Sequence, residues 1–350
     1  MTVIAIDAMG GDFAPDEIVK GVVAASREFD VRYILAGSRE RIEILLAAYK
    51  TTPSEAGIVE ILNTDTIIGM DEEPSAALSA KPDASIVRAA ESVAQGKADA
   101  LVSAGNTGAV ILAAAKNIPL IPGIERSAFA AYYPTARFDP LRAGTALLLD
   151  VGATLHCEPK HLVHFAVMGH VYSTYITGIN SPRIGLLNVG TEPEKGGKTL
   201  VSTHSILRTI KELNFIGNIE GFDIIKGKAD VIVCEGMLGN IVIKLSEGIT
   251  ETILALGKFA YKRTFAYRVA LSILYPGIKK LKKHTDYSEH GGASLLGFSK
   301  PIIKAHGRSA SHAIKNAIGV AAKTVDFTIN DKIADMIQSV NQTVQWKQPE

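Results

Sequence analysis

The chain has 350 residues, of which 47% are hydrophobic and only 6% aromatic, and its formal net charge is +1. A chain of this length buries a large core, and an excess of small and branched apolar residues is typical of α/β proteins. The near-neutral charge argues against a nucleic-acid-binding protein, and two widely spaced cysteines exclude a disulfide framework.

The beginning of the sequence does not resemble a signal peptide, because an apolar run starts at Val3 with no basic region ahead of it. No uninterrupted apolar run approaches the roughly 20 residues of a membrane-spanning helix. We therefore expect a cytoplasmic protein.

Short apolar runs alternate with longer amphipathic segments along the chain, which predicts repeated strand–helix units. The predicted strands are 3–6, 32–36, 58–62, 100–103, 129–132, 145–150, 184–188 and 231–234. The predicted helices are 17–29, 39–49, 85–95, 110–116, 159–177, 199–212, a long helix from near 238, and 309–328. We predict one α/β domain over residues 1–330, built on an open, mostly parallel sheet in three layers, and a polar C-terminal tail over 331–350.

Polar residues end several of the predicted strands. They are Asp7, Ser103, Asp150, Asn188 and Glu235. Since open parallel sheets bind ligands outside the carboxyl ends of their strands, we expect these residues to face one crevice.

The stretch from Ser103 to Ala109 lies between a predicted strand and an alanine-rich helix. Gly105 and Gly108 permit a tight turn and close approach of a ligand to the main chain. The first N–H groups of the helix favour an anion there. The stretch is therefore either a phosphate site or an ordinary turn in which Asn106 and Thr107 cap the helix.

Three further glycine turns have polar neighbours. The turn at 7–15 contains two aspartates, of which Asp12 is also a good helix cap, and the turn at 236–244 places Asn240 and Lys244 on one helix face. The third turn follows His290.

Familiar cofactor signatures are missing or incomplete. No G-x-G-x-x-G follows the first strand, and the segment that ends in Lys198-Thr199 begins with Glu192 where a P-loop needs glycine. Lys198 still lies at a predicted helix start, where an anion is favoured. Cys157, His161 and His164 have no fourth ligand nearby, so capping or solvated histidines are the favoured interpretation and we predict no metal site.

The segment 252–285 contains eight Lys or Arg residues, no acidic residue, and many large apolar side chains between them. This composition is typical of a helix that binds a membrane surface or an acidic partner. A helical hairpin that packs on the domain or on a second subunit is the alternative.

Many of these blocks, in the same order, resemble the PlsX-type phosphate acyltransferases of bacterial phospholipid synthesis. The resemblance extends from the first strand to about Gly319. It includes 7–12, 102–109, 149–153, 165–169, 185–190, 217–221, 236–244, 290–293 and 306–307. After 71–74 the family usually has a basic cluster and paired serines, of which this chain keeps Lys81, Asp83 and Ser85.

The resemblance implies a Rossmann-like fold similar to phosphotransacetylases and isopropylmalate dehydrogenases, in a cytoplasmic homodimer that contacts the membrane peripherally. It implies that inorganic phosphate attacks the thioester of acyl-acyl-carrier protein, giving acyl phosphate and free carrier protein. This chemistry needs no cofactor and no metal, since phosphate is already a nucleophile and a thiolate leaves readily.

We assign candidate residues on this basis. Substrate-binding candidates are Asp7, Gly10, Gly11, Asp12, Lys81, Ser103, Gly105, Asn106, Thr107, Asp150, Asn188 and Lys198. Candidates for stabilising the oxyanion or the thioester are Asn240, Lys244 and His290. Candidates for membrane or carrier contact are Lys258, Phe259, Lys262, Arg263, Phe265, Arg268, Lys279, Lys280, Lys282 and Lys283.

Two other classes of function remain as alternatives. An oxidoreductase of the isopropylmalate dehydrogenase type would share the fold, but the sequence has no dinucleotide fingerprint. A non-catalytic membrane-surface scaffold would use the basic segment alone and would not need four glycine turns.

Overall fold

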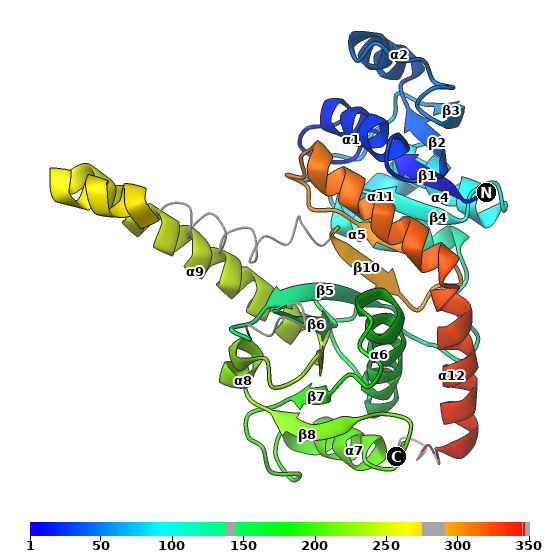
Figure 1. Ribbon diagram of the computed structural model, residues 1–350. Helices are drawn as coiled ribbons and strands as arrows, with labels where there is room; N and C mark the ends of the chain where they lie inside the picture. Colours follow the sequence, from blue (N-terminus) through cyan, green and yellow to red (C-terminus); the bar gives the residue numbers. More distant parts are fainter. Residues whose placement is uncertain (138–143, 275–290, 345, 347–350) are drawn as a thin grey trace.

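The computed structural model describes residues 1–137, 144–274, 291–344 and 346. Within these residues, one eleven-stranded sheet runs through the molecule in the order β3-β2-β1-β4-β11-β10-β5-β6-β9-β7-β8, with helices on both faces (Figure 1). The predicted α/β class and layered sheet are confirmed.

The first half of the sheet is parallel. Its apolar strand residues alternate between two buried clusters, one under α1 and α11 and the other under α3, α4 and α5. The strands are β1 (Val3–Asp7), β2 (Arg32–Gly37), β3 (Ile58–Asn63), β4 (Ala100–Ser103) and β11 (Ile302–Lys304). The helices are α1 (Asp16–Ser26), α2 (Arg39–Ala48), α3 (Pro74–Ala80), α4 (Ser85–Ala94), α5 (Thr107–Asn117) and α11 (Ser311–Asp326).

Most strands of the second half run opposite to the first half. Strand β10 pairs antiparallel with both β11 and β5, and β5 pairs antiparallel with β6, so β5 keeps the direction of the first half while β10 and β6 oppose it. Its strands are β5 (Ala128–Pro134), β6 (Thr145–Leu149), β7 (Ile184–Leu187), β8 (Phe215–Ile219), β9 (Val231–Val233) and β10 (Ala293–Leu296). Its helices are α6 (Pro159–Tyr172) with the π-helical turn Ser173–Thr177, α7 (Gly197–Leu207) and α8 (Gly221–Lys226).

This reversal affects the predicted crevice. The carboxyl ends of β1 and β4 and those of β6, β9 and β7 lie on nominally opposite edges of the sheet, so the rule for parallel sheets does not bring them together. Twist accumulates over the six steps from β1 to β9 at about 20–25° per step, which turns β9 by roughly 120–150°. A twist of this size would turn the ends of the reversed strands partly back toward those of the first set.

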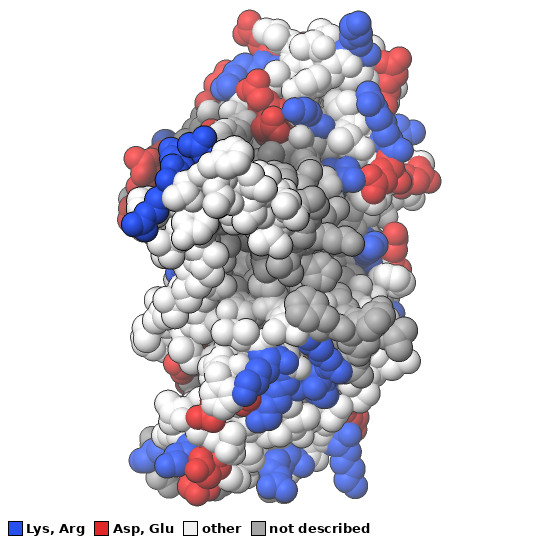
Figure 2. Space-filling view, turned by 60° about the vertical axis from the view of Figure 1, so that its left-hand side comes forward, with Lys and Arg blue, Asp and Glu red and all other residues white. Residues whose placement is uncertain are grey.

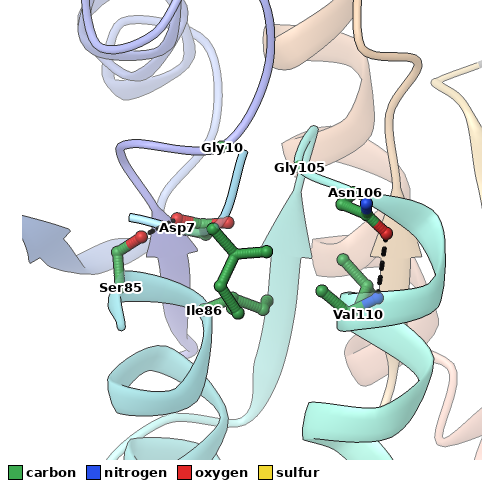
Figure 3. Close-up of a pocket in the computed structure, with 9 residues that line it drawn as sticks. Asp7, Gly10, Ser85, Ile86, Gly105, Asn106 and Val110 are labelled. Carbon is green, nitrogen blue, oxygen red and sulfur yellow. Dashed lines mark hydrogen bonds between the residues drawn. The ribbon is translucent and has the colours of Figure 1, made fainter. Parts of the chain in front are cut away.

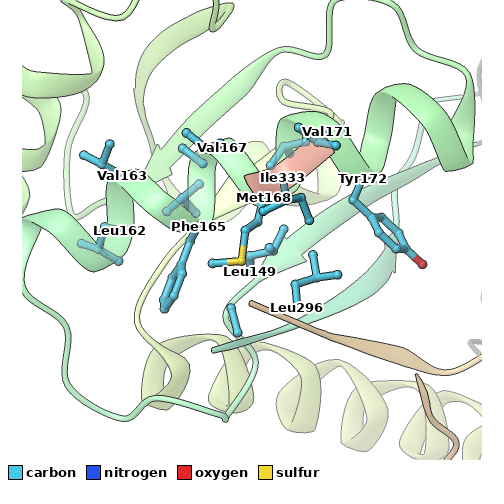
Figure 4. Close-up of a cluster of buried hydrophobic side chains, with 14 of the residues drawn as sticks. Leu149, Leu162, Val163, Phe165, Val167, Met168, Val171, Tyr172, Leu296 and Ile333 are labelled. Atoms are coloured by element: carbon cyan, nitrogen blue, oxygen red, sulfur yellow. The ribbon is translucent and has the colours of Figure 1, made fainter. Parts of the chain in front are cut away.

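Helix α12 (Ile329–Thr343) corrects the prediction of a polar tail over 331–350. Ile329, Ile333, Ile337 and Val340 are buried on one face, and α12 packs against α6 in the largest core of the second half (Figure 4). The prediction failed because this apolar face is narrow and the mean hydropathy of the segment is low, although the spacing of three and four residues is helical. The single domain over residues 1–330 stays a prediction.

Helix α9 (Gly236–Arg263) projects from the body of the molecule (Figure 1). Its 28 residues give it a length of about 42 Å. Beyond its first turns most side chains are exposed, and residues 265–274 continue as helix. The predicted protruding helical segment is confirmed as far as residue 274, and the rest of 252–285 lies outside the described residues. No helix in the described part of the chain has the length and apolar character needed to cross a membrane.

Candidate active site at the carboxyl ends of strands β1, β4 and β11

Asp7, the last residue of β1, is the most buried charged group of this region, with 2% of its surface exposed. Its carboxylate accepts a hydrogen bond from Ser85 Oγ at 2.6 Å (Figure 3) and another from Ser103 Oγ at 2.7 Å. Burial raises the pKa of Asp7, while the two serines and the charge of Lys304 act in the opposite direction. Asp7 thus ties the end of β1 to α4 and to β4.

The turn after β4 is held against the turn after β1. Ser103 Oγ accepts a hydrogen bond from the Gly105 N–H at 3.0 Å. A Cβ atom on Gly10 would lie 2.3 Å from Asp7 Oδ2 and 2.8 Å from the Gly105 nitrogen, so only glycine fits there. The predicted residues Asp7, Gly10, Ser103 and Gly105 are therefore brought together.

Asn106 has a structural role at the start of α5. Its Oδ1 accepts the Ala109 N–H at 3.2 Å, and its Nδ2 donates to the carbonyl oxygens of Met70 and Glu72 at 3.2 and 3.0 Å. The capping alternative is thereby confirmed for Asn106. A direct contact of its side chain with phosphate would require these bonds to break, so that role stays a prediction.

Thr107 and Gly108 present the open side of this turn. Thr107 is exposed, and the N–H groups of both residues have no hydrogen-bond partner within the described chain. These are the free donors that a helix start offers to an anion.

A cavity lies beneath the turn and is lined by Asp7, Ser85, Gly105, Asn106 and apolar side chains (Figure 3). Its volume of about 10 Å³ is roughly the space for one water molecule. A phosphate ion is larger, so it would have to bind on the open side, at Thr107 and Gly108.

Strand β11, which was not predicted, and the loop after it complete the region. Lys304 pairs in register with Ser103, and the Asp12 N–H donates to the Gly307 carbonyl oxygen at 2.8 Å. Gly11 lies in the same turn, with φ at +112°. Asp12 is thus held at this site through its backbone.

His306 connects this region to helix α9. Burial lowers the pKa of His306, and the charge of Glu247 raises it while Lys304 and Lys244 lower it further. Lys244 and Glu247 of α9 therefore lie near enough for their charges to act on the loop after β11. Lys244 is exposed and lies 3.3 Å from Glu247, and Asn240 is exposed beside Gly152. His290 and Lys279, Lys280, Lys282 and Lys283 lie outside the described residues.

Asp150 is fully buried, and its carboxylate binds main-chain groups rather than facing solvent. Its Oδ1 accepts N–H groups of Phe129, Gly152 and Ala153 at 2.7, 3.1 and 3.0 Å, and its Oδ2 accepts that of Thr154 at 2.6 Å. Burial raises the pKa of Asp150 and these four bonds oppose that shift. These contacts favour a structural role for Asp150 over a role in substrate binding.

Three other substrate-binding candidates either bind neighbouring groups of the protein or lie away from this site. Asn188 donates to the Lys195 carbonyl oxygen at 3.0 Å and accepts the Val189 N–H at 2.8 Å, which closes that loop. Lys81 forms an ion pair of 2.7 Å with Glu72. Lys198 is exposed in the first turn of α7, in the second half of the sheet.

The histidines that were considered as metal ligands have protein partners. His161 Nδ1 accepts the Glu158 N–H at 3.0 Å as part of a helix cap, and its Nε2 faces Glu125 at 3.3 Å. His164 Nε2 contacts Asn341 at 3.0 Å. The capping interpretation is confirmed for His161.

Sequence reasoning missed two functional groups of this region. Ser85 was noted only as a residue shared with the resembling family. Lys304 was overlooked because β11 has only three residues, too few for a periodicity. The signal was nonetheless present, since 302–307 repeats the pattern of an apolar strand, a polar residue and a glycine turn.

Comparison with known proteins gives close relatives over nearly the full chain. A family profile described as "Fatty acid synthesis protein" matches residues 2–332. A protein named phosphate acyltransferase from Dictyoglomus turgidum is 41% identical over 337 residues, which are 96% of this chain and 98% of the relative. One of the same name from Moorella thermoacetica is 43% identical over 333 residues, 95% of each chain.

Solved structures resemble the whole fold. A phosphotransacetylase from Streptococcus pyogenes aligns with a TM-score of 0.61, and the EutD phosphotransacetylase from Staphylococcus aureus with 0.59. Each alignment covers 93% of this chain and 94% of the other, at 16% identity. At this identity the likeness concerns the fold alone, and it confirms the predicted similarity to phosphotransacetylases.

Proposed function

We propose how this site works from one premise: the chain belongs to the phosphate acyltransferase family. It is an acyltransferase that converts acyl-acyl-carrier protein and inorganic phosphate to acyl phosphate and free carrier protein. The observation that carries this function is the identity of 41–43% to phosphate acyltransferases over at least 95% of the chain.

The proposed mechanism is direct attack of phosphate on the thioester. A phosphate oxygen forms a bond to the carbonyl carbon, the C–S bond breaks, and the electron pair leaves with sulfur as a thiolate that then takes a proton. No acyl-enzyme is required. Both cysteines are buried, and burial raises the pKa of Cys157 to about 12 and that of Cys234 well above its ordinary value, which makes them poor nucleophiles.

We place the phosphate on the open side of the α5 start. The free N–H groups of Thr107 and Gly108 and the Thr107 hydroxyl would hold its oxygens, and Asp7, Ser85 and Ser103 would keep the turn in position. The donors for the oxyanion that develops on the thioester carbonyl would come from Asn240, Lys244 and His290.

The decisive experiment incubates the protein with acyl-acyl-carrier protein and phosphate and traps acyl phosphate with hydroxylamine as a hydroxamate. Expected is a product whose formation depends on phosphate and accompanies free carrier thiol. Release of thiol at the same rate without phosphate would identify a thioesterase instead and contradict the proposal.

The projecting arm, residues 236–274, supports a further part of the proposal. Large apolar side chains are exposed along it, among them Leu245, Leu256, Phe259 and Phe265 at 63%, 62%, 66% and 79%. Figure 2 shows this side of the molecule, where a broad uncharged surface is bordered by groups of Lys and Arg. Soluble proteins rarely leave a large contiguous apolar surface exposed to water.

We propose that the protein is a cytoplasmic homodimer that contacts an anionic membrane peripherally, with the base of the arm against the second subunit and its far end against lipid. Lys258, Lys262, Arg263 and Arg268 would meet the lipid headgroups while Phe259 and Phe265 enter the interface. The same basic surface suits the acidic carrier protein.

Two variants separate these contacts. Phe259→Ser with Phe265→Ser should abolish sedimentation with phosphatidylglycerol vesicles and leave the dimer intact in analytical ultracentrifugation. Leu245→Glu should instead weaken the dimer. Unchanged vesicle binding of the first variant would refute the membrane contact, and an unchanged dimer of the second would refute the subunit contact.

A further inference from the structure

Lys304 lies in a row of three polar residues at one edge of the sheet. Strands β1, β4 and β11 are adjacent and parallel. Ser103 on β4 pairs with Lys304 on β11. On its other side the register pairs Ile6 with Val102, so that Asp7 lies next to Ser103. Residues paired in register point to the same face of a sheet. Asp7, Ser103 and Lys304 therefore share the face that α5 covers, and α5 contacts β11 as well as α4.

The Lys304 ammonium is buried without its full set of hydrogen bonds. Only 7% of the residue is exposed. An ammonium has three donors, and among the described residues Lys304 Nζ donates only to the Ala305 carbonyl oxygen. A buried charge with unused donors is costly, so such a group indicates a missing partner.

Two aspartates supply the charges that act on Lys304. Asp7 at the end of β1 and Asp12 in the loop after it favour the ammonium form, while His306, two residues beyond Lys304, has a pKa that burial lowers. Burial outweighs the aspartates and lowers the pKa of Lys304 to about 8. Ser103 Oγ, its neighbour on β4, is already engaged with Asp7 and the Gly105 N–H.

We infer that Lys304 is a ligand of the substrate phosphate and donates from the floor of the site to an anion held at the start of α5. This inference rests on the proposed function and adds to it the cation of the phosphate site. The ammonium also offsets the negative charge of Asp7 and Asp12, which would otherwise repel a phosphate dianion.

The same chemistry would suit a second phosphate, the phosphodiester in the prosthetic arm of the carrier protein. We assign Lys304 to inorganic phosphate because the lysine lies beside β4, whose end leads into the start of α5, where we place that anion. A change in the KM for phosphate would identify inorganic phosphate as the ligand, and a change in the KM for the carrier protein would identify the phosphodiester.

The test compares Lys304→Met, which keeps the length of the side chain without its charge, with Lys304→Arg, which keeps the charge. Lys300→Met, at the other end of the same β10–β11 hairpin, is the matched control. A hydrogen bond to a charged group contributes about 1.5–3 kcal/mol, so the KM for phosphate should rise about ten- to hundredfold in Lys304→Met. The KM for acyl-carrier protein should stay within about twofold, Lys304→Arg should recover part of the loss, and Lys300→Met should match the wild type.

A second measurement needs no acyl donor. Inorganic phosphate should raise the thermal unfolding midpoint of the wild type and of Lys300→Met but not that of Lys304→Met. This arm keeps the inference testable if no acyl phosphate is formed, because that result would overturn the proposed function without touching the binding of phosphate.

A third measurement uses the wild type alone and decides the matter if Lys304→Met does not fold. The phosphate-induced rise in the midpoint should fade as the pH increases beyond about 8, since the ammonium is lost there while phosphate stays a dianion. In Lys304→Arg the rise should persist. An unchanged KM for phosphate in a folded Lys304→Met, a raised KM for the carrier alone, or a phosphate effect independent of pH up to 10 would each overturn the inference.

Discussion

Replacing Asp150 by Asn distinguishes a structural carboxylate from a substrate ligand. Asn has one acceptor oxygen, which can keep the three bonds made by Oδ1 but turns an NH₂ group toward the Thr154 N–H, now 2.6 Å from Oδ2. The lost charge-assisted bond costs about 1.5–3 kcal/mol, and the remaining bonds weaken, while the relief of burying a charge offsets part of this. We expect a net loss of about 3 kcal/mol.

This loss can be measured as a shift of the thermal midpoint. At about 2.1 cal/mol/K per residue, unfolding of 350 residues has an entropy of about 0.7 kcal/mol/K, so a loss of 3 kcal/mol lowers the midpoint by about 4 °C. Asp335→Asn on the exposed side of α12 is the control and should not shift it. A midpoint within about 1 °C of the wild type together with a raised KM for either substrate would show that Asp150 binds substrate and that our reasoning is wrong.

Three further predictions address other parts of the molecule. Ile337→Ala should destabilise the protein by about 2–4 kcal/mol in calorimetry, because Ile337 is fully buried between α12 and the core, and no change would mean that α12 is not packed there. Thr107→Val keeps the shape of the side chain and should raise the KM for phosphate severalfold with no change of stability; an unchanged KM would remove Thr107 from the site. Glu17 accepts the Ser311 N–H at 2.6 Å, which lowers its pKa below 4.5, so this bond stabilises the fold at neutral pH and is lost as the pH falls below that value. Glu17→Gln should therefore flatten the acid limb of the stability curve, and an identical limb would contradict the assignment.

Local sequence patterns determined most helices and strands of this protein. The predicted strand 100–103 is observed with the same bounds, and the helix predicted at 85–95 is observed as Ser85–Ala94. These segments are strongly periodic and end at glycine or polar residues, so the pattern contains the information. The short strands β10 and β11 escaped because three or four residues define no period, and α12 escaped because its apolar face is narrow.

The sequence also indicated the family and the turn from Ser103 to Ala109, since glycine and capping residues at a strand end have few alternative structures. It could not decide which polar residues remain available for a ligand. Asn106, Asp150, Asn188 and Lys81 all bind other groups of the protein, while Thr107 does not, and Asn106 reaches the carbonyl oxygen of Glu72, 34 residues away. The hydrogen-bond partners of a side chain depend on main-chain groups far away in sequence, which only the folded chain brings within reach.

Sheet direction was decided by tertiary structure alone. The apolar residues of most strands reveal them in the sequence, but nothing in Ala128–Pro134 or Ala293–Leu296 indicates whether the strand pairs parallel or antiparallel with its neighbour. The antiparallel pairs of β10 with β11 and of β5 with β10 and β6 leave β10, β6, β9, β7 and β8 running against the first half of the sheet. The sequence by itself determined most of the elements and the family of this protein. The pairing of β11 with β4, which places the buried Lys304 beside Ser103, arose only from long-range contacts.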